Sequence, residues 1–224
     1  MISKTQLSEI KAFLDKSENP LFLFDDDADG LCSYLLFKKY VDRGKGVVIK
    51  CSPTLGSDFV RKVEEYSPDI VFVLDKPNIS EDFISNVHVP LIWVDHHGPV
   101  DVKGVKYYNP KINNPDVYLP TSYVCYKVVK QNLWIAMCGI IADWCIPNDL
   151  FDGFLKKYPD LVEKTDNPGD VLYKQPFGKM IKMFSFILKG KTSEVNTCVN
   201  ILTKVESPYE LLNQTTSRAK YIHR

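Results

Sequence analysis

The stretch FLFDDDADGLCS, residues 22–33, joins an apolar run to three carboxylates at alternate positions and then to a glycine. The carboxylates are Asp25, Asp27 and Asp29, and the apolar run before them is typical of a buried strand. If the extended geometry continues into the acidic part, alternation places the three side chains on one face, about 6 to 7 Å apart. Negative charges this close repel one another unless a cation lies between them. The stretch therefore indicates a metal site whose oxygen ligands suit Mg²⁺ or Mn²⁺.

Two other interpretations of the same stretch need to be weighed. A D-x-D-x-D-G string also opens an EF-hand loop, but position twelve counted from Asp25 is Leu36 rather than glutamate. A solvated acidic turn after a buried strand is the second alternative. A metal site therefore needs further ligands elsewhere in the chain.

Composition describes an ordinary soluble protein long enough to bury a full core. The 224 residues contain 28 Lys and Arg and 28 Asp and Glu. With no global positive field, any contact with nucleic acid must come from a local patch or from another domain.

Cysteines and apolar runs bear on the compartment. The six cysteines form no C-x-x-C pair, and reduced thiols favour the cytoplasm. The N-terminus resembles a charged amphipathic helix rather than a signal peptide. The apolar run 133–142 is only half the ~20 residues that a membrane span needs. We expect a cytoplasmic protein with no membrane contact.

Short β-rich runs alternate with helical patterns through the first half of the chain. This alternation predicts an α/β fold: a doubly wound, mainly parallel sheet of about five strands flanked by helices, followed by a helical C-terminal part. The expected strands are Leu21–Phe24, Val47–Cys51, Ile70–Leu74, Leu91–Val94 and Val105–Tyr108. The expected helices between them are Leu31–Val41, Asp58–Tyr66 and Glu81–Val87.

Metal-binding residue types follow three of these strands. The first strand runs into the three aspartates, the third ends at Asp75, and the fourth ends at Asp95, His96 and His97. Ligands of parallel sheets gather beyond the carboxyl ends of the strands. This convergence is the main argument for a site.

The second half of the chain is predicted to be helical. Leu133–Ile146 contains one charged residue, Asp143, and a lone carboxylate in so apolar a helix is costly unless it is paired or metal-bound. A hydrogen-bonded core aspartate or an emergence at the helix end are the alternatives. We expect a catalytic core over residues 1–148, a helical extension over 149–205 and a truncated connector helix over 206–224.

Four motifs together resemble those of the DHH phosphoesterases: Asp25 to Gly30, Asp75, Asp95-His96-His97 and the segment 139-GIIADW-144. The first motif is more similar to the RecJ-type nucleases than to the branches that place a histidine where this chain has Leu23. The resemblance covers roughly residues 18–145. It implies an N-terminal catalytic domain, because nothing here matches the C-terminal DHH-associated domain of that family.

The resemblance also implies a ligand set for two ions, Mn²⁺ or Mg²⁺. Asp27 and Asp75 would hold one ion, with Asp25 as the candidate that completes it. The second ion would be held by Asp29, Asp75, His96 and Asp143. Two such ions lower the pKa of a shared water and stabilise the attacking and leaving oxygens.

Catalytic roles are expected for three residues beside these ions. Asp75 would bridge the ions, and His97 would point away from His96 and contact the phosphate or leaving group. Asp95 would orient a ligand without being one.

The function implied is a single-strand nuclease or exonuclease acting on DNA or RNA, with replication or repair proteins as candidate partners. A hydrolase of short oligoribonucleotides or cyclic dinucleotides is one alternative. A replication scaffold with little activity is another, opposed by the presence of every motif acid and of His96.

Overall fold

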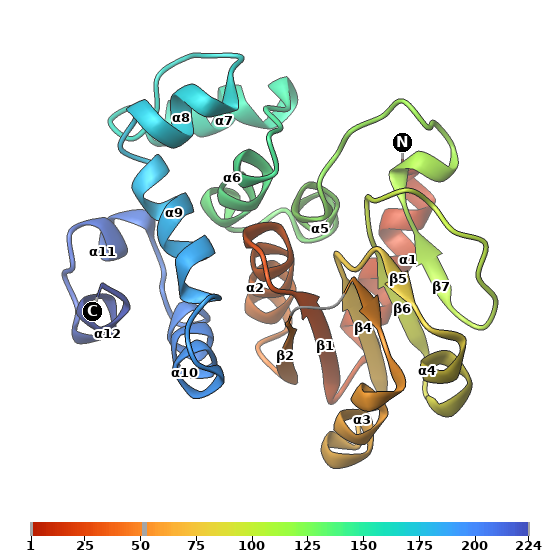
Figure 1. Ribbon diagram of the computed structural model, residues 1–224. Coiled ribbons are helices and arrows are strands. Elements are labelled where there is room, and N and C mark those ends of the chain that lie inside the picture. The colour runs from red at the N-terminus through yellow and green to blue at the C-terminus, as the bar shows by residue number, and fades with distance from the viewer. Residues whose placement is uncertain (1, 51–52, 224) are drawn as a thin grey trace.

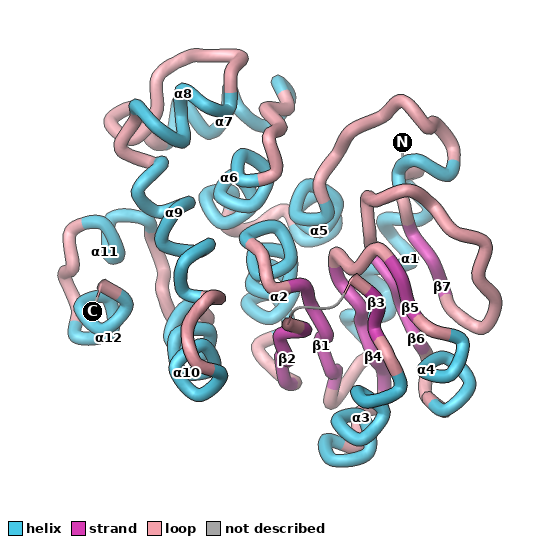
Figure 2. The backbone as a smooth tube through the Cα atoms, in the orientation of Figure 1, coloured by secondary structure: helices cyan, strands magenta, loops and turns pink. Residues whose placement is uncertain are grey.

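The computed structural model describes residues 2–50 and 53–223 and contains a five-stranded, all-parallel sheet (Figures 1 and 2). Its strand order is β2-β1-β4-β6-β7, which confirms the predicted fold class. The bounds of these strands are Pro20–Asp25 (β1), Lys45–Ile49 (β2), Ile70–Leu74 (β4), Leu91–Val94 (β6) and Lys106–Tyr108 (β7). Two short strands, Thr54–Leu55 (β3) and Asn78–Ile79 (β5), form a separate parallel pair that the sequence did not predict.

Several helices begin at residues whose side chains cap the free backbone N–H groups of the first turn. Such caps are Ser3, Asp27, Ser80, Asn167, Ser207 and Thr216. The α-helices are Lys4–Lys16 (α1), Ala28–Val41 (α2), Val60–Tyr66 (α3), Glu81–Asn86 (α4), Thr121–Val129 (α5), Leu133–Ala142 (α6), Asn148–Lys157 (α7), Pro168–Lys174 (α8), Gly178–Ile187 (α9), Thr192–Leu202 (α10), Pro208–Leu212 (α11) and Ser217–Ile222 (α12). Two short 3₁₀ helices cover Ser57–Phe59 and Pro110–Ile112.

Two hydrophobic cores lie on opposite faces of the sheet. Because side chains alternate along a strand, Phe22 and Phe24 of β1 enter one core while Leu21 and Leu23 enter the other. The first core is completed by α1, α2, α5, α6 and the C-terminal helices, and the second by α3 and α4. Helices on both faces explain why these strands are apolar throughout.

The C-terminal helices α7 to α12 extend the first core away from the sheet (Figure 1). Asn167 caps α8, and Pro168 occupies the first helical turn, where its missing N–H costs nothing. The single connector helix is two short helices, α11 and α12. Cys51, the expected end of one strand, lies outside the described residues.

The strand order reverses next to β1, because β2 lies on one side of it and β4 on the other. In open parallel sheets such a switch point leaves a crevice beyond the carboxyl ends of the strands. The residues after β1, β4 and β6 therefore share one edge of the sheet. Among the described residues, no helix has the length and apolar character needed to cross a membrane.

Candidate metal centre

The corner between β1 and α2 does not keep the three aspartates on one face, which corrects the expectation from alternation. β1 ends at Asp25, and Asp27 caps α2 by accepting a hydrogen bond from the N–H of Gly30 at 2.9 Å. Once the cap starts the helix, Asp29 lies in its first turn and its side chain takes another direction. A side chain at position 30 would collide with the backbone of Asp25. The glycine therefore permits this sharp corner.

Asp29 is buried against the N-terminus of α5. Its carboxylate accepts hydrogen bonds from the N–H of Thr121 at 2.7 Å, from the N–H of Ser122 at 2.9 Å and from the Ser122 hydroxyl. Burial and then the charge of Asp27 raise its pKa to about 6, although the bonds from Ser122 and Thr121 oppose the shift. The N-terminus of α5 thus fixes the position of Asp29, but its hydrogen bonds do not offset the cost of burying the charged carboxylate.

Asp75 follows β4 in a left-handed backbone conformation, with φ of 64°, a region that aspartate and asparagine tolerate better than most residues. Its Oδ1 accepts a hydrogen bond from the Thr121 hydroxyl at 2.8 Å. Its Oδ2 is buried and has no hydrogen-bond partner among the described residues. Burial, followed by the charges of Asp29, Asp27 and Asp95, raises the pKa of Asp75 well above its usual value. A buried oxygen of this kind is a candidate ligand atom.

His96 follows β6, and its Nε2 atom faces three carboxylates. The distances are 3.4 Å to Oδ1 of Asp75, 3.5 Å to Oδ2 of Asp143 and 4.0 Å to Oδ2 of Asp29. Burial lowers the pKa of the imidazole, which favours the neutral form that binds metals. Its Nδ1 is buried without a hydrogen-bond partner among the described residues.

Asp143 lies at the C-cap of α6, so the helix ends four residues earlier than the predicted Ile146. Its carboxylate emerges at the helix end and accepts a hydrogen bond from the Tyr118 hydroxyl at 2.7 Å. Burial, followed by the charge of Asp29, raises its pKa to about 6. The apolar helix thus delivers its one charged residue to the sheet edge.

His97 is held by Asp95. The fully buried Asp95 accepts hydrogen bonds from the backbone N–H of His97 at 3.0 Å and from the side-chain amide of Asn109 at 3.0 Å. Its Oδ1 lies 2.7 Å from Nδ1 of His97. This hydrogen bond is the largest cause of the raised pKa of His97. Asp95 therefore orients the second histidine.

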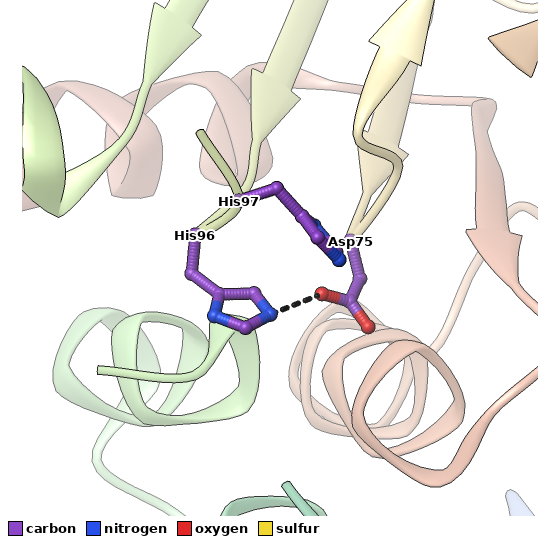
Figure 3. Close-up of side chains that lie close together, drawn as sticks. All are labelled: Asp75, His96 and His97. Carbon is purple, nitrogen blue, oxygen red and sulfur yellow. Dashed lines mark ion pairs between the residues drawn. The ribbon is translucent and has the colours of Figure 1, made fainter. Parts of the chain in front are cut away.

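Two overlapping groups can hold a metal ion: Asp75, His96 and His97 in one, and Asp29, His96 and Asp143 in the other. Within each group the ligand atoms lie within 4.8 Å of one another. Figure 3 shows the rings of His96 and His97 both close to Asp75. The expectation that His97 points away from His96 is therefore wrong, because the bond to Asp95 turns its ring toward the same centre.

Asp25 is directed to a different partner. Its Oδ1 accepts from Nζ of Lys76 at 2.7 Å, and the Lys76 side chain is only 1% exposed. The backbone carbonyl of Lys76 in turn accepts from the Trp93 indole at 2.9 Å. Asp25 and Asp27 belong to neither of the two metal-binding groups.

The sequence did not single out the groups that support the acids. Thr121 and Ser122 were not among the predicted site residues, although their hydroxyls bond Asp75 and Asp29. Lys76 follows Asp75 directly, but a lysine beside a motif acid gives no signal of burial. Where two distant segments meet is decided by packing, and a single sequence does not show it.

The fold and the site together define an α/β domain with a carboxylate-histidine cluster at the carboxyl edge of a parallel sheet. The sequence matches no protein-family model and no curated protein. Solved structures with the same fold are found. A crystal structure of exonuclease RecJ bound to manganese matches at 15% identity and a TM-score of 0.58, covering 91% of this chain and 66% of that one.

Two further structures share the fold. RecJ from Thermus thermophilus in complex with Mn²⁺ matches at 17% identity and a TM-score of 0.57, covering 88% of this chain and 37% of that one. The DHH domain of a member of a ribosomal protein family matches at 11% identity and a TM-score of 0.52, covering 98% of this chain and 56% of that one. The chain has the fold of these RecJ and DHH-domain structures and spans only part of their length.

Proposed function

We propose that the chain is a RecJ-like DHH phosphoesterase that hydrolyses phosphodiester bonds with two divalent cations, Mn²⁺ or Mg²⁺. The observation that carries the proposal is the meeting of Asp29, Asp75, Asp143 and His96 at one sheet edge, where Nε2 of His96 lies 3.4 to 4.0 Å from an oxygen of each carboxylate. The buried Oδ2 of Asp75 has no hydrogen-bond partner among the described residues, so the donor set fits a cation. An imidazole among oxygen ligands favours Mn²⁺ over Mg²⁺.

Residues of both groups have distinct parts in this proposal. Asp29, Asp75, His96 and Asp143 would hold one ion, and Asp75, with His96 and His97, would hold the second. We assign Asp25 to Lys76 rather than to a metal, because its Oδ1 lies 2.7 Å from that ammonium. When bound, a pair of divalent cations generates hydroxide from water and stabilises the attacking and leaving oxygens of a phosphodiester.

The surrounding side chains keep the ligands in place. Thr121 fixes Oδ1 of Asp75, and the start of α5 fixes both oxygens of Asp29. Tyr118 restrains Asp143, and Asp95 restrains His97. Outer bonds of this kind set the orientation of metal ligands and influence affinity.

Single-stranded DNA or RNA is the proposed substrate. Two observations support this choice: the fold that the chain shares with the two RecJ structures, and the RecJ-like pattern D-x-D-x-D-G of its first motif. A hydrolase of small phosphoesters remains the competing function.

Hydrolysis assays test the proposal. End-labelled single-stranded DNA, an RNA dinucleotide and a chromogenic phosphodiester are incubated with Mn²⁺ and either the native chain or Asp75→Asn. The substitution is chosen because asparagine accepts the left-handed backbone at position 75. We expect it to lower the rate roughly a thousandfold, which corresponds to ~4 kcal/mol of transition-state stabilisation.

A matched control is Asp101→Asn, which changes an exposed acid outside the site. Equal activity of Asp75→Asn and the native chain would contradict the two-metal proposal. Preference for the dinucleotide over longer DNA would select the competing small-substrate function.

A further inference from the structure

A groove of about 790 Å³ runs along the outer side of strand β2, away from the carboxylate-histidine cluster. β2 is the edge strand of the sheet, so no further strand pairs with its outer side in the described part of the chain. The opposite wall is formed by α10, and Phe59 and Tyr66 contribute from the α3 side. Figure 1 shows α10 beside the β2 edge. The groove therefore lies between the sheet and the C-terminal helical part.

The groove carries an excess of positive charge, although the chain as a whole is neutral. Five lysines line it, against a single acid, whereas lysine and arginine equal aspartate and glutamate over the full sequence. The charged lining residues are Lys38, Lys45, Lys50, Lys62, Lys204 and Asp42. Two of the lysines have partners: Lys62 lies 2.7 Å from Glu65, and Lys50 donates to the carbonyl of Gly190 at 2.7 Å. The groove is thus the kind of local positive patch that a neutral chain needs to contact a polyanion.

The α10 wall carries hydrogen-bonding side chains at helical spacing. Thr192, Asn196 and Asn200 follow one another every fourth residue and all line the groove, together with the largely buried Val195 and Val199. Amide and hydroxyl groups bond phosphate, sugar and base edges. An acidic peptide added to the strand edge would instead need apolar pockets for alternate side chains.

One end of the groove, marked by Lys50, lies toward the sheet edge that carries the motif acids. In the β1–β2 ladder, Ile49 is the register partner of Asp25, so Lys50 stands beside the corner that carries the motif acids. Gly46 lies in the groove, where any side chain would collide with the ring of Tyr34. The absence of a side chain at Gly46 leaves room for the ring of Tyr34, which packs against the strand there.

We propose that this groove binds the phosphodiester backbone of single-stranded nucleic acid and guides the strand toward the sheet edge. The inference rests on the proposed function for the role of that polymer as substrate, and it selects a polynucleotide over a small phosphoester. Lys45 on the strand and Lys204 after α10 face the polymer from the two walls, and both are exposed. The aromatic rings of Phe59 and Tyr66 provide stacking surfaces.

Binding measured without catalysis tests the groove directly. Fluorescence anisotropy of a labelled single-stranded oligonucleotide is recorded in EDTA over a range of salt concentrations. The double variant Lys45→Glu/Lys204→Glu is compared with Lys103→Glu/Lys164→Glu, which makes the same charge change at exposed lysines outside the groove. We expect the groove variant to bind roughly tenfold more weakly and to lose about 1.4 from the slope of log K against log salt, because each phosphate contact on a single strand contributes ~0.7.

The outcomes separate this inference from the proposed function. Equal losses of oligonucleotide affinity in the two double variants, or no loss in either, would overturn the groove assignment. The proposed function would still be tested by hydrolysis of the chromogenic diester. A groove-specific loss with no hydrolysis of any substrate would support the groove and overturn the phosphoesterase. Labelled polyglutamate bound as tightly as the oligonucleotide, with the same loss in the groove variant, would overturn the choice of nucleic acid in favour of an acidic peptide.

Discussion

Carboxylates in the two halves of the molecule have pKa values shifted in opposite directions. At the sheet edge, the pKa values of Asp29 and Asp143 rise to about 6, and that of Asp75 is also raised well above its usual value. In the C-terminal helices, the pKa of Glu210 falls to about 2. All four side chains are largely removed from water, the most accessible being Asp143 at 26% exposure. Burial alone therefore does not explain the difference.

The neighbours explain it. Glu210 accepts hydrogen bonds from the Arg218 guanidinium at 2.5 and 3.2 Å, from the Thr216 hydroxyl at 2.8 Å and from the backbone N–H of Glu206 at 3.1 Å. The acids of the sheet edge face one another and a neutral imidazole instead. Glu210, paired with Arg218, links α11 to α12. The buried acids of the sheet edge have no such partner among the described residues and form a candidate site for an added cation.

Metal binding by Asp75→Asn is the largest expected effect. Calorimetry with Mn²⁺ should show affinity reduced by roughly 100-fold or more, because the residue belongs to one metal-binding group and adjoins the other. In EDTA at pH 8 the variant should be at least as stable as the native chain. The raised pKa means that ionising Asp75 is harder in the folded state, so above its ordinary value of 3.8 the native acid costs stability.

This stability difference should close as the pH falls and Asp75 is protonated in the native chain. Asp101→Asn serves as the control, since it changes an exposed acid outside the site. Native-like Mn²⁺ affinity in Asp75→Asn would contradict the proposal that the acids of the sheet edge bind an added cation, whereas Glu210 is paired with Arg218.

Lys76→Met extends the comparison to the sheet edge, where Asp25 is paired with a buried lysine. The substitution leaves Asp25 without its ammonium partner in a partly buried position. We expect the free energy of unfolding at pH 7 to fall by about 2 to 4 kcal/mol, because breaking a buried pair strands the remaining charge. Urea denaturation in EDTA measures the change.

The matched control is Lys62→Met, which breaks an exposed pair with Glu65 at the same 2.7 Å separation. Exposed pairs contribute little to stability, because water and salt screen their charges. The double variant Asp25→Asn/Lys76→Met should recover much of the loss. If Lys76→Met costs no more than Lys62→Met, the buried pair is not what holds Asp25 away from the metal-binding groups.

The fold could be read from the sequence because strand and helix patterns are local. All five main strands were expected within a few residues of their bounds, and the acids after β4 and β6 fall at the predicted edge. The prediction that failed was that the extended geometry of β1 continues through Asp27 and Asp29. Asp27 caps the helix that begins at Ala28, Asp25 at the end of β1 pairs with Lys76, and Asp29 in the first turn of α2 bonds the start of α5. The buried bonds from Thr121 and Ser122 join residues about ninety positions apart in one case and nearly fifty in the other, and local pattern carries no trace of them.

Glu210→Gln is the smallest and most diagnostic of the stability effects. The lowered pKa means that ionised Glu210 is favoured by folding, so its contribution is present above the ordinary value of 4.5 and is lost as the pH falls from 4.5 toward about 2. We expect the variant to lose about 1 to 2 kcal/mol of unfolding free energy at pH 7, since Arg218 is partly exposed and its charge is screened.

Urea denaturation of Glu210→Gln at pH 7, 4 and 2.5 should show this gap narrowing with acid. Glu163→Gln is the control, because it makes the same change at an exposed glutamate of the C-terminal helical part. For Asp75→Asn at pH 8 we expect a difference of the opposite sign: the free energy of unfolding of the variant should be at least that of the native chain. A gap for Glu210→Gln that does not change with pH would show that Arg218 leaves the pKa of Glu210 unshifted, and the contrast between the two halves of the molecule would fail.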